Sequence, residues 1–116
     1  MRVFLTSPDL LFRSKLRGTV TARGGVVASD PAACDLAVLA LEVPGALDRL
    51  RALAGAGVPV IAYASHVRAD LLRAAREAGA VAVPNSEVEH RLAAVLTSPP
   101  PSLRSDGDGP SRPSGA

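Results

Sequence analysis

The chain has 116 residues, of which 47% are hydrophobic and 21% charged, and its formal net charge is +2. This length suits one domain with a single modest core. The one cysteine, Cys34, excludes an intrachain disulfide and a metal site built from several cysteines. The N-terminus lacks the pattern of a signal peptide, and no stretch approaches the roughly 18 apolar residues of a membrane span. We therefore expect a cytoplasmic protein that contacts no membrane.

The basic residues stand singly along the chain, and twelve of the thirteen are arginine. A groove for nucleic acid would instead combine clustered Lys and Arg with interleaved aromatic side chains. The only aromatic residues are Phe4, Phe12 and Tyr63. This composition predicts no direct contact with nucleic acid.

The chain opens with a short apolar run, residues 2–6, which predicts a buried strand. A helix is expected to begin at Pro8. Ser7 suits its N-cap, proline suits its first position, and Asp9 complements the helix dipole.

The end of this helix has two interpretations. The apolar face begun by Phe12 continues through Val20, which favours a helix that runs to about Ala22 and stops before a glycine pair. Alternatively, the helix ends at Gly18 and residues 19–28 form a hairpin.

The rest of the chain alternates short apolar runs with amphipathic stretches. The segment DPAAC, residues 30–34, is too short for more than one helical turn. Ser86 is expected to cap the last helix, with Glu87 and Glu89 in its first turn. Strands are predicted at 25–29, 35–42, 58–64 and 81–83, and helices at 44–57, 68–80 and 86–96.

This alternation predicts an α/β fold, a flavodoxin-like three-layer sandwich around a five-stranded parallel sheet of order 2-1-3-4-5. Its second helix is reduced or missing, because only 30–34 are available for it. The folded domain is expected to span 1–96. The Pro-, Ser- and Gly-rich segment 97–116 holds one large apolar residue, Leu103, and is expected to be a disordered tail.

In such a sheet the ligand crevice lies at the carboxyl ends of the strands. A magnesium site would need clustered carboxylates, and a serine hydrolase would need a Gly-x-Ser-x-Gly elbow. A phosphate-binding loop would need glycines directly after the first strand. The sequence offers none of these, so we expect neither an enzyme nor a bound metal or cofactor. The polar residues predicted to line the crevice are Ser7, Asp9, Glu42, Ser65, His66, Asn85 and Ser86.

Three stretches resemble the receiver domains of two-component response regulators, and the resemblance covers residues 2–96. DLAVLALEVPG (35–45) is similar to the third strand, which carries the phosphoacceptor aspartate. VPVIAYAS (58–65) is similar to the fourth strand with its Thr or Ser. LLRAAREAGAVAVPNS (71–86) is similar to the fourth helix and the fifth strand, which leads to a lysine. The resemblance implies a receiver-like fold and a signalling role.

Each position that the resemblance marks for phosphoryl transfer holds another residue type. An alanine methyl cannot accept a phosphoryl group, and without paired carboxylates nothing holds the metal that neutralises the transferring charge. The resemblance therefore implies a degenerate receiver that is not phosphorylated. The phosphoacceptor position falls on Ala40, the acidic pair on Ser7 and Pro8, the switch residue on Ala64, and the lysine on Asn85 or Ser86.

The leading hypothesis is a non-phosphorylatable receiver-like module that acts by protein–protein contact. The short segment 30–34 would leave part of the sheet uncovered near its second strand. Exposed apolar patches usually mark interfaces, so we expect a protein partner or self-association there. The alternative is a sensor that binds a small ligand or nucleotide through the polar residues of the crevice.

Overall fold

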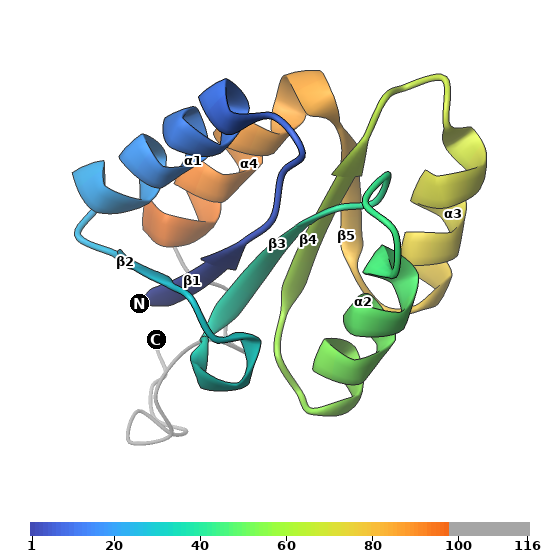
Figure 1. The fold of residues 1–116 in the computed structure, drawn as a ribbon, viewed down its shortest axis with the longest axis horizontal. Helices are drawn as coiled ribbons and strands as arrows, with labels where there is room; N and C mark the ends of the chain where they lie inside the picture. Colours follow the sequence, from blue (N-terminus) through green and yellow to red (C-terminus); the bar gives the residue numbers. More distant parts are fainter. Residues whose placement is uncertain (98–116) are drawn as a thin grey trace, which may run out of the picture.

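The computed structural model describes residues 1–97 as a five-stranded parallel sheet with helices on both faces (Figure 1). The strand order is β2-β1-β3-β4-β5, and every neighbouring pair is parallel, which confirms the predicted flavodoxin-like architecture. The predicted tail lies outside the described residues, except for Thr97. In chain order the elements are β1 (Arg2–Leu5), α1 (Leu10–Ala22), β2 (Val26–Ala28), the 3₁₀ turn η1 (Pro31–Ala33), β3 (Leu36–Ala40), α2 (Ala46–Gly55), β4 (Val60–Ala64), α3 (Ala69–Glu77), β5 (Val81–Pro84) and α4 (Asn85–Thr97).

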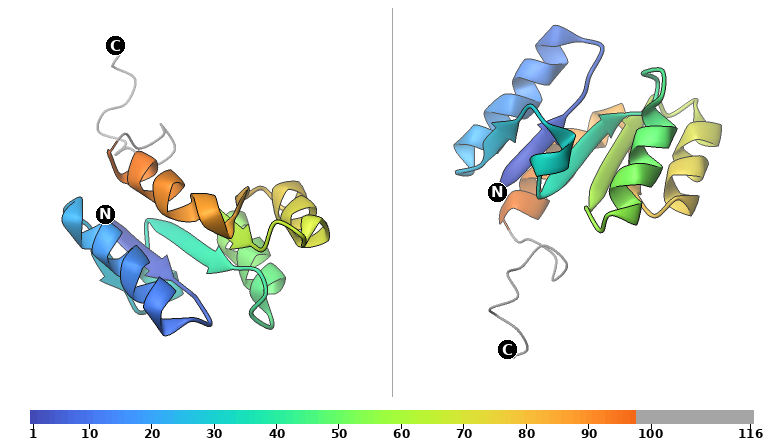
Figure 2. Two further views of the ribbon diagram at one scale, coloured as in Figure 1. Left: turned by 90° about the horizontal axis from the view of Figure 1, so that it is seen from above. Right: turned by 60° about the horizontal axis from the view of Figure 1, so that its bottom comes forward.

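Two apolar cores lie on opposite faces of the sheet (Figure 2). Helices α1 and α4 cover one face, where Leu16 and Leu92 are fully buried. Helices α2 and α3 cover the other face, where they bury Leu50 and Leu72. Strands β3 and β4 lie between both layers, and every residue in them is buried. This is why their sequences are apolar throughout instead of alternating with polar residues.

The start of α1 differs from the prediction. Asp9, not Ser7, is the N-cap, because its carboxylate accepts hydrogen bonds from the backbone N–H groups of Leu11 at 2.9 Å and Phe12 at 3.3 Å. The backbone of Asp9 is extended, so Pro8 lies outside the helix. The Ser7 hydroxyl instead accepts the Asp9 N–H at 3.1 Å, which makes a local turn before the cap.

The end of α1 matches the favoured interpretation. The helix continues to Ala22, and Gly24 then adopts a positive φ of 81° that lets the chain turn into β2. Strand β2 pairs in parallel with β1, so the alternative hairpin over 19–28 is wrong.

Two other helix starts also differ from the prediction. Helix α2 begins at Ala46, because Gly45 in the left-handed region keeps Pro44 out of the helix. Helix α4 begins at Asn85, directly after the last residue of β5. Ser86 therefore lies inside the first turn of α4, and the prediction that it caps this helix is wrong.

The link between β2 and β3 contains no α-helix, as expected. The carboxylate of Asp30 accepts the Ala32 N–H at 2.9 Å and caps the single turn η1. The part of the sheet formed by β1 therefore has no α-helix over it on the α2 side. A groove of about 730 Å³ lies there between η1 and α2, with Phe4 and Leu39 among its lining residues.

Leu16 and Leu10 of α1 offer a matched test of this layering. Leu16 is fully buried under α1, whereas Leu10 is 80% exposed at the start of the same helix. We expect Leu16→Ala to lower the free energy of unfolding by about 2–5 kcal/mol, because it leaves a cavity in the core. Leu10→Ala should change it by no more than about 0.5 kcal/mol. Urea denaturation followed by circular dichroism measures both, and equal effects would contradict the assignment of faces.

Candidate functional site

A crevice of about 260 Å³ opens at the carboxyl ends of β1, β3 and β4. It lies at the edge of the sheet where parallel α/β proteins place their ligands. Ala40 is 3% exposed and ends β3, and its register partner in β4 is Tyr63. The lining residues are Ser7, Pro8, Asp9, Phe12, Ala40, Glu42, Tyr63, Ala64 and Asn85.

Thr6 ties the three strands together beside this crevice. Its backbone N–H donates to the Val38 carbonyl oxygen at 2.9 Å, which extends the pairing of β1 and β3 by one residue. Its side-chain hydroxyl accepts the Ala40 N–H at 2.9 Å. Its carbonyl oxygen accepts the hydroxyl of Tyr63 at 2.8 Å. The polar backbone groups at the ends of β1 and β3 are thus satisfied from within the fold.

An aromatic pair forms one wall of the crevice. The rings of Phe12 and Tyr63 meet edge to face, with centroids 5.4 Å apart and an angle of 60° between their planes. Tyr63 is only 4% exposed. Burial raises the pKa of Tyr63, and the negative charge of Asp9 adds to this shift.

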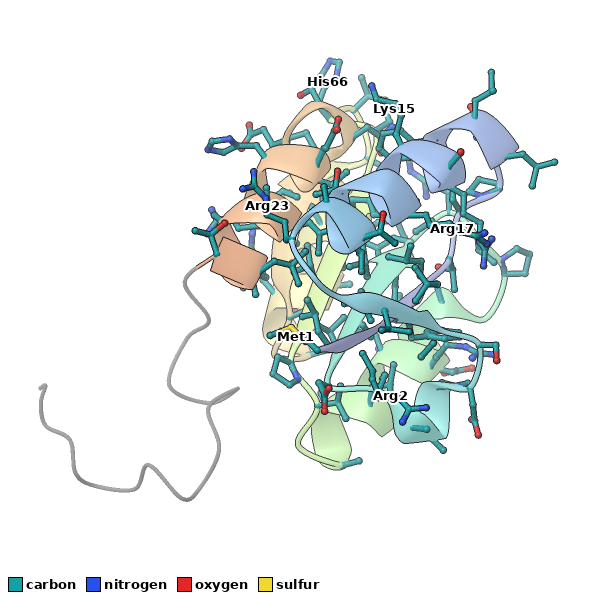
Figure 3. The ribbon with its side chains drawn as sticks, turned by 90° about the vertical axis from the view of Figure 1, so that its left-hand side faces the viewer. Met1, Arg2, Lys15, Arg17, Arg23 and His66 are labelled. Carbon is teal, nitrogen blue, oxygen red and sulfur yellow. The ribbon has the colours of Figure 1, made fainter. Side chains whose placement is uncertain are left out.

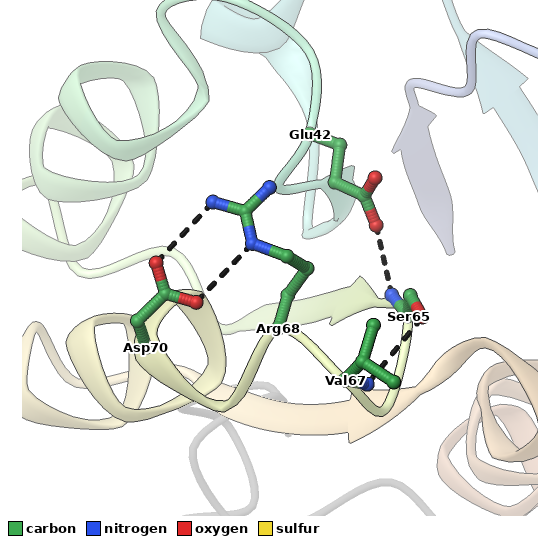
Figure 4. A network of polar contacts seen from close by, with 5 residues as sticks. All are labelled: Glu42, Ser65, Val67, Arg68 and Asp70. Carbon is green, nitrogen blue, oxygen red and sulfur yellow. Dashed lines mark hydrogen bonds and ion pairs between the residues drawn. The ribbon is translucent and has the colours of Figure 1, made fainter.

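Both carboxylates in the crevice already hold backbone groups. Asp9 caps α1. Glu42, in the loop after β3, accepts the backbone N–H of Ser65 at 2.8 Å and so joins the β3–α2 loop to the β4–α3 loop (Figure 4). In the same network Arg68 donates two hydrogen bonds of 3.2 Å to Asp70, which lower the pKa of that carboxyl.

The structure brings four of the seven predicted polar residues together in the crevice, namely Ser7, Asp9, Glu42 and Asn85, and with them Ala40, the predicted phosphoacceptor position. The other three are placed differently. Ser65 is half-buried and is attached to the crevice through Glu42, while His66 is exposed in the loop after β4 and does not line the crevice. Ser86 faces a separate hollow between α1 and α4.

The aromatic wall was not predicted from the sequence. From the sequence, Phe12 was assigned only to an apolar helix face, and no role was predicted for Tyr63. Strand alternation places Tyr63 on the same face as Ile61, and Phe12 lies in the first turn of the helix that covers that face. These two signals together could have placed both rings near the strand ends.

Among residues 1–97, no group of three or more His, Cys, Asp and Glu side chains is arranged to hold a metal ion. Within the same range, no helix is long and apolar enough to cross a membrane. The basic side chains labelled in Figure 3, among them Arg2, Lys15, Arg17 and Arg23, lie apart from one another over that side of the molecule. Lys15 pairs with Glu89 of α4 at 3.6 Å.

No protein-family model and no curated protein matches the chain. Solved structures match it in fold. NtrX from Brucella abortus, in complex with ADP, has a TM-score of 0.68 at 18% identity, and the match covers 83% of this chain but 26% of NtrX. The chain thus spans about a quarter of that protein.

Two further structures match over most of their own length. One is the receiver domain of TorR, the response regulator of a TMAO respiratory system, with a TM-score of 0.70 at 18% identity. The match covers 83% of this chain and 92% of the chain of that receiver domain. The CMP N-glycosidase BcmB from Clostridium botulinum has a TM-score of 0.63 at 19% identity, with coverage of 79% and 98%. At these identities the likeness shows a receiver-like fold.

Tyr63 is the only tyrosine and the chain has no tryptophan, so the near-ultraviolet absorbance of tyrosinate reports this residue alone. We expect Tyr63 to titrate above its ordinary pKa of about 10 in the folded protein and near that value in urea. The unfolded chain then loses the Tyr63 proton at a lower pH than the folded protein does. The contribution of Tyr63 to the free energy of unfolding is therefore fully present below about pH 10 and decreases as the pH rises further. Tyr63→Phe should remove this pH dependence and cost about 1 kcal/mol for the lost hydrogen bond. A folded-state titration at or below the urea value would contradict the buried placement.

The Glu42 contact predicts a local effect on the β4–α3 loop. Glu42→Ala should speed amide hydrogen exchange at Ser65 by about two- to tenfold, because it removes the carboxylate that accepts this N–H. Asp70→Ala is the matched control, since Asp70 belongs to the same network but has no bond to Ser65. Exchange measured by NMR should show no change at Ser65 in the control. An unchanged rate in Glu42→Ala would mean that Glu42 does not hold the loop.

Proposed function

We propose that this chain is a receiver-like signalling module that is not phosphorylated and that acts by contact with another protein. The observation that supports this most strongly is Ala40, whose buried methyl group stands at the exit of β3 in the floor of the crevice. Phosphoryl transfer to a receiver-like site needs a nucleophile at this exit. A methyl group has no lone pair to form the new bond to phosphorus.

The other residues of the crevice support the same proposal. A transferring phosphoryl group carries negative charge that cations or hydrogen-bond donors must offset. The lining includes two carboxylates, Asp9 and Glu42, and no basic side chain. An anion brought to Ala40 would therefore meet like charge.

The contacts between the loops favour a module that keeps a single conformation without being modified. Glu42 holds Ser65 from across the sheet edge, and both residues lie in loops that flank the end of β3 or β4. The negatively charged group that holds the β4–α3 loop is thus the Glu42 carboxylate, which is part of the chain itself. A docking surface built on these loops would be present without any modifying enzyme.

A sensor for a small ligand is the second candidate, and the aromatic wall of Phe12 and Tyr63 is the observation that favours it. Aromatic walls with a few polar groups are typical of small-molecule sites. The crevice of about 260 Å³ is smaller than most such sites, and its carboxylates are engaged. We therefore place this function second.

The phosphorylation half of the proposal has a direct test. The full chain is incubated with acetyl phosphate and Mg²⁺, and intact-mass spectrometry measures any phosphoryl adduct. We expect none, because Ala40 offers no acceptor oxygen. A receiver domain with an aspartate at this position serves as the positive control under the same conditions. A substantial adduct on this chain would refute the proposal, and peptide mapping would identify the acceptor.

A further inference from the structure

The groove between η1 and α2 is the part of the molecule that the crevice does not explain. We propose that it binds an amphipathic helix of a partner protein, with an apolar stripe on the groove and carboxylates beside the stripe. This inference rests on the proposed function and adds to it the docking surface and the chemistry of the partner.

The shape of the groove fits a helix. Phe4 of β1 and Leu39 of β3 lie at its base, η1 forms one side, and α2 forms the other. Parallel sheets are normally covered by helices on both faces. On this face α2 and α3 provide that cover for β3, β4 and β5, while no helix lies directly over β1, whose Phe4 is covered by the Arg49 side chain of α2 and is 8% exposed. The right-hand view of Figure 2 shows η1 and α2 on the same side of the sheet.

The side of α2 that faces the groove is small and uncharged over its last turns. Ala52 of α2 and Ala56, which directly follows α2, line the groove there, and Pro31 and Ala32 line it from η1. Packed helices lie about 8–10 Å apart, with the shorter distances where side chains are small. These alanines leave room for a second helix to lie alongside α2.

Arg49 determines the charge that the occupant should carry. Its guanidinium lies 5.3 Å above the centroid of the Phe4 ring, at the wall of the groove. Asp48, the acidic residue next to it in the lining, pairs with Arg51 at 3.5 Å. Within residues 1–97 no ion pair involves Arg49.

A carboxylate on the docking helix would therefore have a partner in Arg49. The guanidinium can keep its face on Phe4 while its N–H groups bind the carboxylate, since stacking and hydrogen bonding use different parts of the group. Such opposite charges across an interface select the partner and its orientation.

Other occupants fit less well. A second copy that docks through the same face would bring Arg49 close to its own symmetry mate, and the like charges would repel. The chain's own segment 98–116 holds five prolines and a single large apolar residue, Leu103. It lacks the apolar stripe of an amphipathic helix.

The test uses the immobilised full chain and a phage-displayed library of amphipathic helices of roughly 15 residues, about four turns. The positions that flank the apolar stripe encode Glu and Lys equally. We expect the selected peptides to carry Glu at these positions. The best peptide is then synthesised, and its affinity is measured by fluorescence anisotropy.

Three substitutions locate the binding. Arg49→Glu should weaken the peptide at least about tenfold and select Lys-bearing peptides instead. Ala52→Trp should abolish binding of either kind, because the indole fills the groove. Arg73→Glu makes the same charge reversal on the exposed side of α3, outside the groove, and should leave the affinity within about twofold. Circular dichroism and thermal unfolding verify that each variant is folded, with Arg49→Gln as a milder substitute for Arg49→Glu.

Each other outcome overturns the inference. It fails if no helix is selected, if Glu and Lys are selected equally, or if binding persists in folded Ala52→Trp. A dimer seen by light scattering that disappears in Ala52→Trp would make a second copy the occupant. Tighter peptide binding by full-length Leu103→Ala would make the segment 98–116 the occupant.

The two proposals fail separately. A phosphoryl adduct with acetyl phosphate refutes the proposed function whatever peptides are selected. A chain that stays unmodified and selects no helix refutes only the docking groove.

Discussion

The hydrogen bonds around Thr6 hold the carboxyl edge of the sheet together, and the crevice depends on them. Thr6 receives the Ala40 N–H on its side chain and the Tyr63 hydroxyl on its carbonyl, at 2.9 and 2.8 Å. One residue thus joins the ends of β1, β3 and β4. Because these groups are satisfied by one another, the crevice floor needs no bound ion or ligand to stay in place.

The same contacts explain how a protein with a mainly aliphatic core keeps the carboxyl edge of its sheet ordered. The core consists mainly of Val, Leu and Ala, and its only buried ring with a polar group is Tyr63. Tyr63 therefore both fills space against Phe12 and connects two strands by its hydroxyl. A phenylalanine there would keep the packing and lose the connection.

Much of the fold could be predicted from the sequence, because its signals are local. A few residues are enough to indicate each element. The apolar runs around Val38 and Ile61 indicate strands, and Pro44 with Gly45 indicates a turn. The alternation of strands and helices predicts a parallel sheet, and five strands suit the flavodoxin-like order 2-1-3-4-5. Even the absence of a second helix is visible in the length of the segment 30–34.

The incorrect predictions concern the helix starts, where neighbouring residues could each serve as the N-cap. Ser7 and Asp9 are both good N-caps, and only the extended backbone at Asp9 decides between them. Ser86 looked like a cap because a short loop was assumed, but β5 passes into α4 without one. The contacts of Tyr63 with Thr6 and of Glu42 with Ser65 join distant parts of the chain, so no local pattern could reveal them.

The short link between β2 and β3 has a consequence for how this fold could be altered. It must cross β1, and it does so with only residues 29–35, where parallel strands usually need a dozen or more. Lengthening a loop is cheap in entropy, about 0.6 kcal/mol for each doubling. Chain entropy therefore does not forbid a helix at this point. The link is the natural insertion point for an engineered helix, and a chain extended there would complete its own outer layer.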